Sequence, residues 1–118
     1  MIRGLLKQII LFVMDMESEV WFYRDVLGLE VIFPQDKEDL SQEMWVELDA
    51  GGCALALHGG ADKAPDDEHQ LIFRVDDLEA ARSAILAAGI EIGEIRLLED
   101  ALPVASGVDP AGHHFSIR

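Results

Sequence analysis

The segment Gln8–Leu29 reads QIILFVMDMESEVWFYRDVLGL, and its order of features organises the whole chain. An alternating apolar run leads into an aspartate and then into an amphipathic stretch, and a glycine closes the segment. The same order returns about 60 residues later, where the segment from Gln70 reads QLIFRVDDLEAARSAILAAGI. Two copies at so long a period indicate a duplicated supersecondary module rather than a solenoid. The sequence therefore predicts two copies of one strand–helix–strands unit.

The first copy opens with a predicted strand over residues 5–14 and a helix that follows it. Asp15 is a natural N-cap for this helix, and acidic residues in the first turn suit the helix dipole. Gly28 supplies the left-handed position that ends the helix. Apolar residues at helical spacing predict its buried stripe. These residues are Met16, Val20, Tyr23 and Leu27.

The rest of the first copy is predicted as strands joined by turns. A short strand over residues 29–33 ends at Pro34, and the charged loop 35–41 is expected to be exposed and mobile. Residues 43–49 and 52–58 predict a hairpin around an Ala-Gly turn.

The second copy repeats this plan after the linker. A strand is predicted over residues 69–75, and Asp77 is expected to cap a helix over residues 78–88 that Gly89 stops. Further strands are expected near residues 90–95, at 96–98 or 102–106, and at 113–117.

Length and composition limit the class of protein. A chain of 118 residues predicts a single domain over residues 1–118, with modules at 1–60 and 68–118 and a linker at 59–67. The net charge of −14 would repel phosphate backbones and anionic lipid, so nucleic acid and membrane partners are not expected. A lone cysteine, Cys53, cannot form an internal disulfide, which favours a cytoplasmic protein.

Three quoted motifs resemble the vicinal-oxygen-chelate superfamily, which includes glyoxalase I, extradiol dioxygenases, and bleomycin- and fosfomycin-resistance proteins. They are the D-M-E-to-V-L-G-L segment from Asp15, the hairpin WVELDAGGCALALH from Trp45, and the closing D-P-A-G-H-H-F from Asp109. The resemblance implies an α+β fold in which two βαβββ modules form a curled mixed sheet shaped like a cup. It also implies a homodimer. The scaffold hosts unrelated chemistries, so the fold alone does not give the function.

Metal-dependent members of this superfamily place four metal ligands at fixed positions, usually His or Gln on the first strand of each module and Glu on the last. The resemblance carries these positions onto Gln8, Ala56, Gln70 and Ser116. Two amides, a methyl group and a hydroxyl do not make a site for a divalent transition metal, which prefers imidazole, thiolate or carboxylate. No cofactor is therefore expected.

Strand parity predicts which side chains line the cup, because alternate residues of a strand face opposite sides of the sheet. Met44, Val46 and Leu48 are predicted to face the helix. The predicted ligand-binding residues are Gln8, Phe12, Trp45, Glu47, Ala56, His58, Gln70, Arg74, His114 and Ser116. Apolar walls with a few polar groups are typical of a pocket for an organic molecule.

Several of these residues have two interpretations each. His58 and His114 are either rim histidines or functional imidazoles, and the two glutamines either bond each other across the pseudo-twofold axis or contact a ligand. Arg74, interpreted as buried in mid-strand, either pairs with Glu47 or awaits an anionic ligand.

Three functions remain open from the sequence. The preferred hypothesis is a metal-free protein that resembles the bleomycin-resistance branch and sequesters a small molecule, expected to be aromatic or anionic. The alternative is a lyase, isomerase or dioxygenase-type enzyme with one divalent metal ion at a relocated site formed by His58, His114 and Glu47. The third is a module that serves only dimerisation or regulation.

Overall fold

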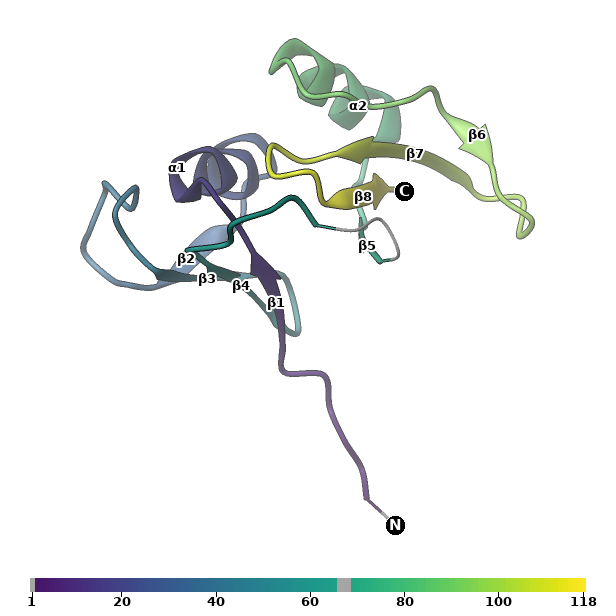
Figure 1. Cartoon of the computed structure of the whole chain (residues 1–118). Helices are drawn as coiled ribbons and strands as arrows, with labels where there is room; N and C mark the ends of the chain where they lie inside the picture. The colour runs from purple at the N-terminus through teal and green to yellow at the C-terminus, as the bar shows by residue number, and fades with distance from the viewer. Residues whose placement is uncertain (1, 66–68) are drawn as a thin grey trace. The chain divides into compact units, whose positions relative to one another are not determined.

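The structure of the protein is a computed structural model that describes residues 2–65 and 69–118. The chain divides into two compact units, Met1–Ala64 and Pro65–Arg118. Each unit holds one copy of the predicted module, with a four-stranded mixed sheet and a helical segment (Figure 1). The predicted linker extends into residues 66–68, and the acidic run there lies outside the described residues. That the whole chain acts as a single domain stays a prediction.

The sheet of the first unit has the strand order β1-β4-β3-β2. Strand β1 pairs in parallel with β4, whereas β4 with β3 and β3 with β2 are antiparallel. The turn between β3 and β4 contains Gly51 and Gly52, both at positive φ, as the predicted hairpin requires. The bounds are β1 Gln8–Phe12, β2 Glu30–Phe33, β3 Trp45–Asp49 and β4 Ala54–His58.

The helical segment of the first unit begins as an α-helix, α1 (Met16–Val20), and continues as a π-helix, η1 (Trp21–Val26). The wider turn is visible where the Leu27 amide bonds the Phe22 carbonyl at 2.9 Å. The sequence pattern predicted one regular α-helix, and the π-helical part was not foreseen. Asp15 occupies the N-cap position, but its side chain makes no capping hydrogen bond.

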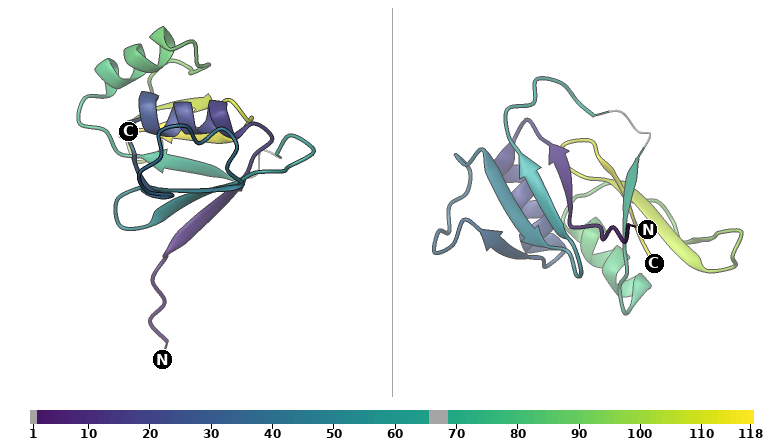
Figure 2. Two further views of the ribbon diagram at one scale, coloured as in Figure 1. Left: turned by 90° about the vertical axis from the view of Figure 1, so that its left-hand side faces the viewer. Right: turned by 90° about the horizontal axis from the view of Figure 1, so that it is seen from below.

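The core of the first unit forms between this segment and one face of its sheet (Figure 2). Of the predicted helix stripe, Met16, Val20 and Tyr23 are buried, and Leu27 is half-buried. Glu19, expected only to serve the helix dipole, is completely buried. The sheet contributes Val46, Leu48, Leu55 and Leu57 to this core. Met44 was predicted to share their face, but it precedes β3 and is 58% exposed, so that prediction was wrong.

The second unit repeats the topology with the strand order β5-β8-β7-β6. Here Asp77 does cap the helix, because its carboxylate accepts a hydrogen bond from the Ala80 amide at 3.0 Å. The predicted strand at residues 90–95 is wrong except for one isolated bridge between Ile92 and Gly107. The bounds are β5 Gln70–Phe73, α2 Leu78–Ala87, β6 Arg96–Leu97, β7 Pro103–Val108 and β8 His114–Ile117.

The segment around Ile92 runs beside β7 and approaches it closely at Gly107. A Cβ on Gly107 would collide with the Glu91 carbonyl oxygen and would lie 3.0 Å from the Phe115 ring. The Val108 amide bonds the Glu91 carbonyl at 3.1 Å, and the Gly93 amide bonds the Ser106 carbonyl at 2.8 Å. The register shifts by one residue between this bridge and the β6 pairing, so no continuous strand forms.

Neither helix in the described part of the chain is long and apolar enough to cross a membrane.

Candidate functional site

The face of each sheet that its own helix does not cover is called the open face here. In the first unit, cross-strand register arranges the open face in rows, because paired residues share one side of a sheet. The first row is Phe12, His58 and Trp45, from β1, β4 and β3. The second row is Ile10, Ala56, Glu47 and Phe33. Parity therefore placed Phe12, Trp45, Glu47, Ala56 and His58 on one face, as predicted.

The first row is a cluster of three rings. The imidazole of His58 lies between Phe12, with ring centroids 5.1 Å apart and a tilted geometry, and Trp45, at 5.9 Å and edge-on. Phe12 is 57% exposed, so a large apolar ring faces outward. Nδ1 of His58 lies 2.7 Å from the Gly59 carbonyl oxygen. Because a carbonyl only accepts, Nδ1 carries the proton, and Nε2 of a neutral ring is left as an acceptor.

Gln8 and Glu47 form the polar part of the open face. The Gln8 side-chain amide donates to Oε1 of Glu47 at 3.1 Å. These residues belong to β1 and β3, the two strands that flank β4, so the bond spans β4. The β4 residues that pair with Gln8 and Glu47 are Ala54 and Ala56, whose small methyl groups leave room for this hydrogen bond. Ala56 is fully buried.

The second unit has a related network at the equivalent positions. The Ser116 hydroxyl donates to Oε1 of Gln70 at 2.7 Å and lies 2.8 Å from the Ser106 hydroxyl. These residues span β5, β8 and β7, in the way that Gln8, Ala56 and Glu47 span β1, β4 and β3. Each glutamine is thus bonded within its own module. Ser106 was not among the predicted site residues, although its cross-strand pairing with Ser116 brings it there.

Arg74 is exposed, so the interpretation as a buried arginine was wrong. It directly follows β5, and the backbone bonds to β8 continue past it: the Arg118 amide bonds the Phe73 carbonyl at 3.1 Å, and the Val75 amide bonds the Arg118 carbonyl at 3.0 Å. Gln70 and Ile72, which share its strand parity, are exposed as well. His114, at the start of β8, is half-buried, and Ile72 is 55% exposed.

The four positions that the resemblance assigns to metal ligands do not suit a metal. Ala56 has no donor atom, and the Ser116 hydroxyl is engaged by Gln70 and Ser106. Among residues 2–65 and 69–118, no three His, Cys, Asp or Glu side chains are grouped so that they could hold a metal ion. His58 and Glu47 belong to the first unit and His114 to the second, so a metal site formed by these three stays a prediction. The expectation that the protein holds no metal cofactor stays a prediction.

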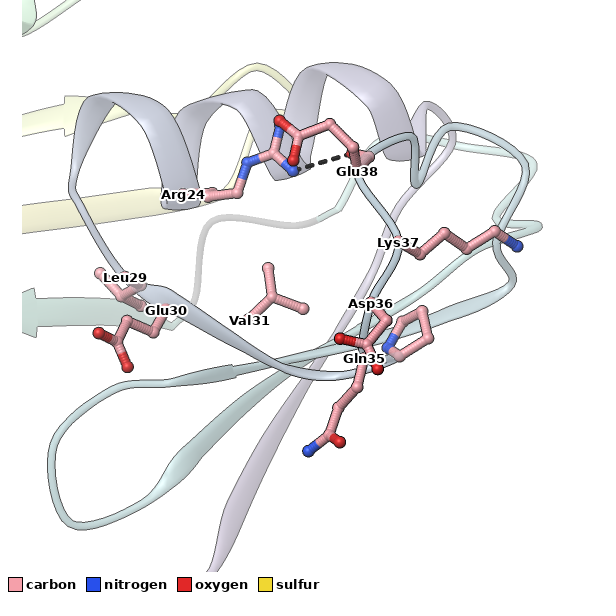
Figure 3. A pocket seen from close by; sticks show the side chains of 9 residues that line it. Arg24, Leu29, Glu30, Val31, Gln35, Asp36, Lys37 and Glu38 are labelled. Atoms are coloured by element: carbon pink, nitrogen blue, oxygen red, sulfur yellow. Dashed lines mark hydrogen bonds between the residues drawn. The ribbon is translucent and has the colours of Figure 1, made fainter.

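A cavity of about 760 Å³ lies away from the open face, in the first unit (Figure 3). Half-buried apolar residues, Leu29, Val31 and Pro34, contribute to its lining, and charged residues surround them. The sequence analysis did not foresee it, because it forms where a charged loop folds back against η1. The remaining lining residues are Arg24, Glu30, Gln35, Asp36, Lys37 and Glu38.

Two modules with the order strand, helix and three strands, each with a parallel first-to-last strand pair, define an α+β protein of the duplicated βαβββ class. The model of the Glyoxalase/Bleomycin resistance protein/Dioxygenase superfamily matches residues 5–117. The chain therefore belongs to this superfamily. No curated protein sequence matches the chain.

Solved structures support the fold. The chain is similar to an antibiotic-binding protein, TnmS3, from Streptomyces sp. CB03234, with 18% identity, coverage of 100% and 97% of the two chains, and a TM-score of 0.78. It is also similar to a lactoylglutathione lyase from Agrobacterium tumefaciens, with 20% identity, coverage of 98% and 92%, and a TM-score of 0.76. The fosfomycin resistance protein FosX from Mesorhizobium loti has 18% identity, coverage of 99% and 92%, and a TM-score of 0.74. At these identities the likeness concerns the fold.

Proposed function

We propose that this protein is a metal-free member of its superfamily that binds and sequesters a small organic molecule on the open faces of its modules. One observation carries the proposal: of the four positions where relatives would hold metal, Ala56 has no donor atom and the other three are engaged in hydrogen bonds within their own module. Gln8 bonds Glu47 across two alanines, and Gln70 bonds Ser116. The first network contains one carboxylate and the second contains none, so neither resembles the charged or imidazole ligand sets that divalent ions prefer.

The row of Phe12, His58 and Trp45 supports an aromatic ligand. Phe12, His58 and Trp45 offer apolar and aromatic surface, and Nε2 of neutral His58 offers one acceptor. Glu47 adds a negative charge beside them. A planar aromatic molecule that carries a hydroxyl or amino donor complements such a surface. On the open face of the second module, the exposed Arg74 and the half-buried His114 suit an anionic ligand group.

The structural likeness to an antibiotic-binding protein and to a fosfomycin resistance protein supports small-molecule binding. A cytoplasmic homodimer belongs to the same proposal.

The two tryptophans of the chain provide the test, because Trp45 is on the open face and Trp21 is on η1. Compounds that raise the melting temperature in the presence of a chelator would be titrated into Trp21→Phe and Trp45→Phe. We expect the emission to change in Trp21→Phe, which keeps Trp45, and to stay constant in Trp45→Phe. The proposal fails if no aromatic compound stabilises the protein, or if only Trp21 responds.

The alternative enzyme would hold one divalent metal ion through His58, His114 and Glu47. The orientation of His58 favours it, since metal-ligating imidazoles commonly donate their second nitrogen to a carbonyl. Elemental analysis after exposure to excess nickel, cobalt, zinc, manganese and iron, followed by desalting, separates the two functions. One tightly held metal per pocket, lost in His58→Ala, would replace the preferred proposal.

A further inference from the structure

The amino-terminal arm, residues 2–7, is an apolar segment that its own chain leaves uncovered. Ile2 is 94% exposed, Leu5 is 91% exposed and Leu6 is 65% exposed. A Cβ built on Gly4 would meet no atom within 4 Å. In Figure 1 the arm continues from the start of β1 and runs away from the sheet. Three large exposed side chains in one short segment are an interaction surface rather than scattered exposure.

The arm also differs in charge from the rest of the chain. Residues 1–14 contain Arg3 and Lys7 and no acidic residue, in a protein whose net charge is −14. A surface that binds this segment should therefore combine apolar side chains with uncompensated carboxylates.

The cavity beside η1 has this composition. Half-buried Leu29, Val31 and Pro34 contribute its apolar part, and Figure 3 places Val31 between Arg24 and the segment at Asp36. Residues 24–43, which surround it, include six acidic and two basic residues. The cavity therefore has a negative rim over an apolar lining.

Both basic residues of that rim are already engaged. Arg24 binds the Asp25 carboxylate through two nitrogens, at 2.9 and 3.3 Å, and donates to the Glu38 carbonyl at 3.1 Å. The hydrogen bond to Asp25 raises the pKa of Arg24. Lys37 forms an ion pair with Glu43, which raises the pKa of Lys37. The remaining carboxylates of the lining are left for a basic partner.

The loop 35–41 is exposed at residues 35–39, as predicted, and its mobility stays a prediction. Leu40, near its end, is 3% exposed and anchors it, and the Glu43 amide bonds the Leu40 carbonyl at 3.1 Å. Such an anchor lowers the entropy that the loop loses when a partner binds.

The arm of the same chain is poorly placed to fill this cavity. In the order β1-β4-β3-β2, β1 and β2 are opposite edges of the sheet, about 14 Å apart at ordinary strand spacing. The pairings make β1 and β2 run in the same direction, so Pro34 lies near the end of the sheet where β1 finishes. The arm leaves from the other end. Its residues span about 20 Å when extended, so reaching the cavity of the same chain would take the full length of the arm and leave no residues to bind there.

We propose that the arm of one copy, residues 2–7, docks in the Arg24–Glu38 cavity of a second copy. Leu5 and Leu6 would contact the apolar lining, and Arg3 and Lys7 would face the acidic rim. The contact is separate from the ligand-binding open face, so it stands or falls independently of the proposed function.

The test uses full-length chains and a labelled peptide of residues 1–8. The receptor is the Leu5→Asp/Leu6→Asp chain, whose own arm cannot compete. We expect saturable binding of the native peptide in fluorescence anisotropy, and loss of binding for a peptide with the same two aspartates. Adding Glu30→Lys/Glu38→Gln to the receptor should weaken binding about tenfold, since it removes or reverses exposed charge pairs. Glu94→Lys/Glu99→Gln changes the charge equally at exposed positions of the other unit and should have little effect.

Self-association of the full chain gives a second readout. In sedimentation velocity the arm variant and the rim variant should each associate more weakly than the unmodified chain. Their mixture should recover part of the association, because one intact arm then meets one intact cavity. Equal binding of the native and aspartate peptides, equal effects of the rim and control variants, or association that none of the variants changes would overturn the proposal.

Discussion

Ser116→Ala is the substitution whose cost follows most directly from the structure. The Ser116 hydroxyl is 2% exposed and joins Gln70, at 2.7 Å, to Ser106, at 2.8 Å. Each neutral hydrogen bond contributes about 1 kcal/mol. Gln70 is exposed and regains water, whereas Ser106 is half-buried and regains less. The free energy of unfolding should therefore fall by about 1–2 kcal/mol, which corresponds to a melting temperature lower by roughly 4–8 °C for a chain of this size.

The first unit shows that alanine fits such a position sterically. Its equivalent residue, Ala56, is fully buried between Ile10 and Glu47, so the cost in Ser116→Ala should come from polar groups and not from packing. Ser83→Ala, on the exposed face of α2, is the matched control and should be close to neutral.

The assay must report on the second unit. Both tryptophans and the single tyrosine belong to the first unit, so intrinsic fluorescence would miss the change. Urea unfolding followed by far-ultraviolet circular dichroism detects both units. A double-mutant cycle with Ser106→Ala should give a coupling of about 1 kcal/mol. A cost for Ser116→Ala no larger than that of Ser83→Ala, or zero coupling, would refute the network described here.

Further predictions follow from the packing and from one ion pair. Gly107→Ala should destabilise the second unit by about 1–3 kcal/mol or prevent its folding, because the new methyl meets the Glu91 carbonyl; a melting curve like that of the unmodified chain would contradict the close approach. Leu40→Ala should cost about 2–4 kcal/mol and raise hydrogen exchange across the cavity rim, and unchanged exchange there would show that Leu40 does not hold the loop. Hydrogen bonds from the Leu102 amide and, second, from the Arg118 guanidinium lower the pKa of Asp100. The Asp100 carboxylate therefore stabilises the fold at pH values above its unfolded pKa, and this stabilisation is lost as the pH falls through its folded pKa. In Asp100→Asn the loss of stability at acid pH should be smaller, and equilibrium unfolding between pH 5 and pH 2 measures it.

The fold followed from the sequence because its signals are local and doubled. Alternating apolar residues, an aspartate before each helix and a glycine after it appear in both copies, and Gly28 and Gly89 indeed have positive φ. Parity identified the open face correctly, since the period of a strand is fixed by its backbone. The superfamily resemblance was confirmed by the family match.

The sequence could not give features that depend on contacts between distant segments. Whether a helix turn widens into η1, and how deeply Glu19 is buried, depends on the packing of that segment as a whole. Residues 90–95 have strand-like composition, but only Ile92 pairs with β7, because the register shifts by one residue between this bridge and β6. Arg74 is exposed because, like Gln70 and Ile72 of the same parity, it lies on a sheet face that its own unit leaves uncovered, and strand period alone does not show what covers a face.

The candidate site also has one part that followed from the sequence and one part that only the tertiary structure decided. Sequence by itself determined that Ala56 and Ser116 cannot supply the superfamily's acidic ligands, because this depends only on which atoms the side chains contain. Tertiary structure decided what the neighbouring polar groups do instead. Glu47 reaches Gln8 and Ser106 reaches Ser116 only because cross-strand register sets them side by side. Composition fixes the available donors and acceptors, and register and packing decide which of them meet.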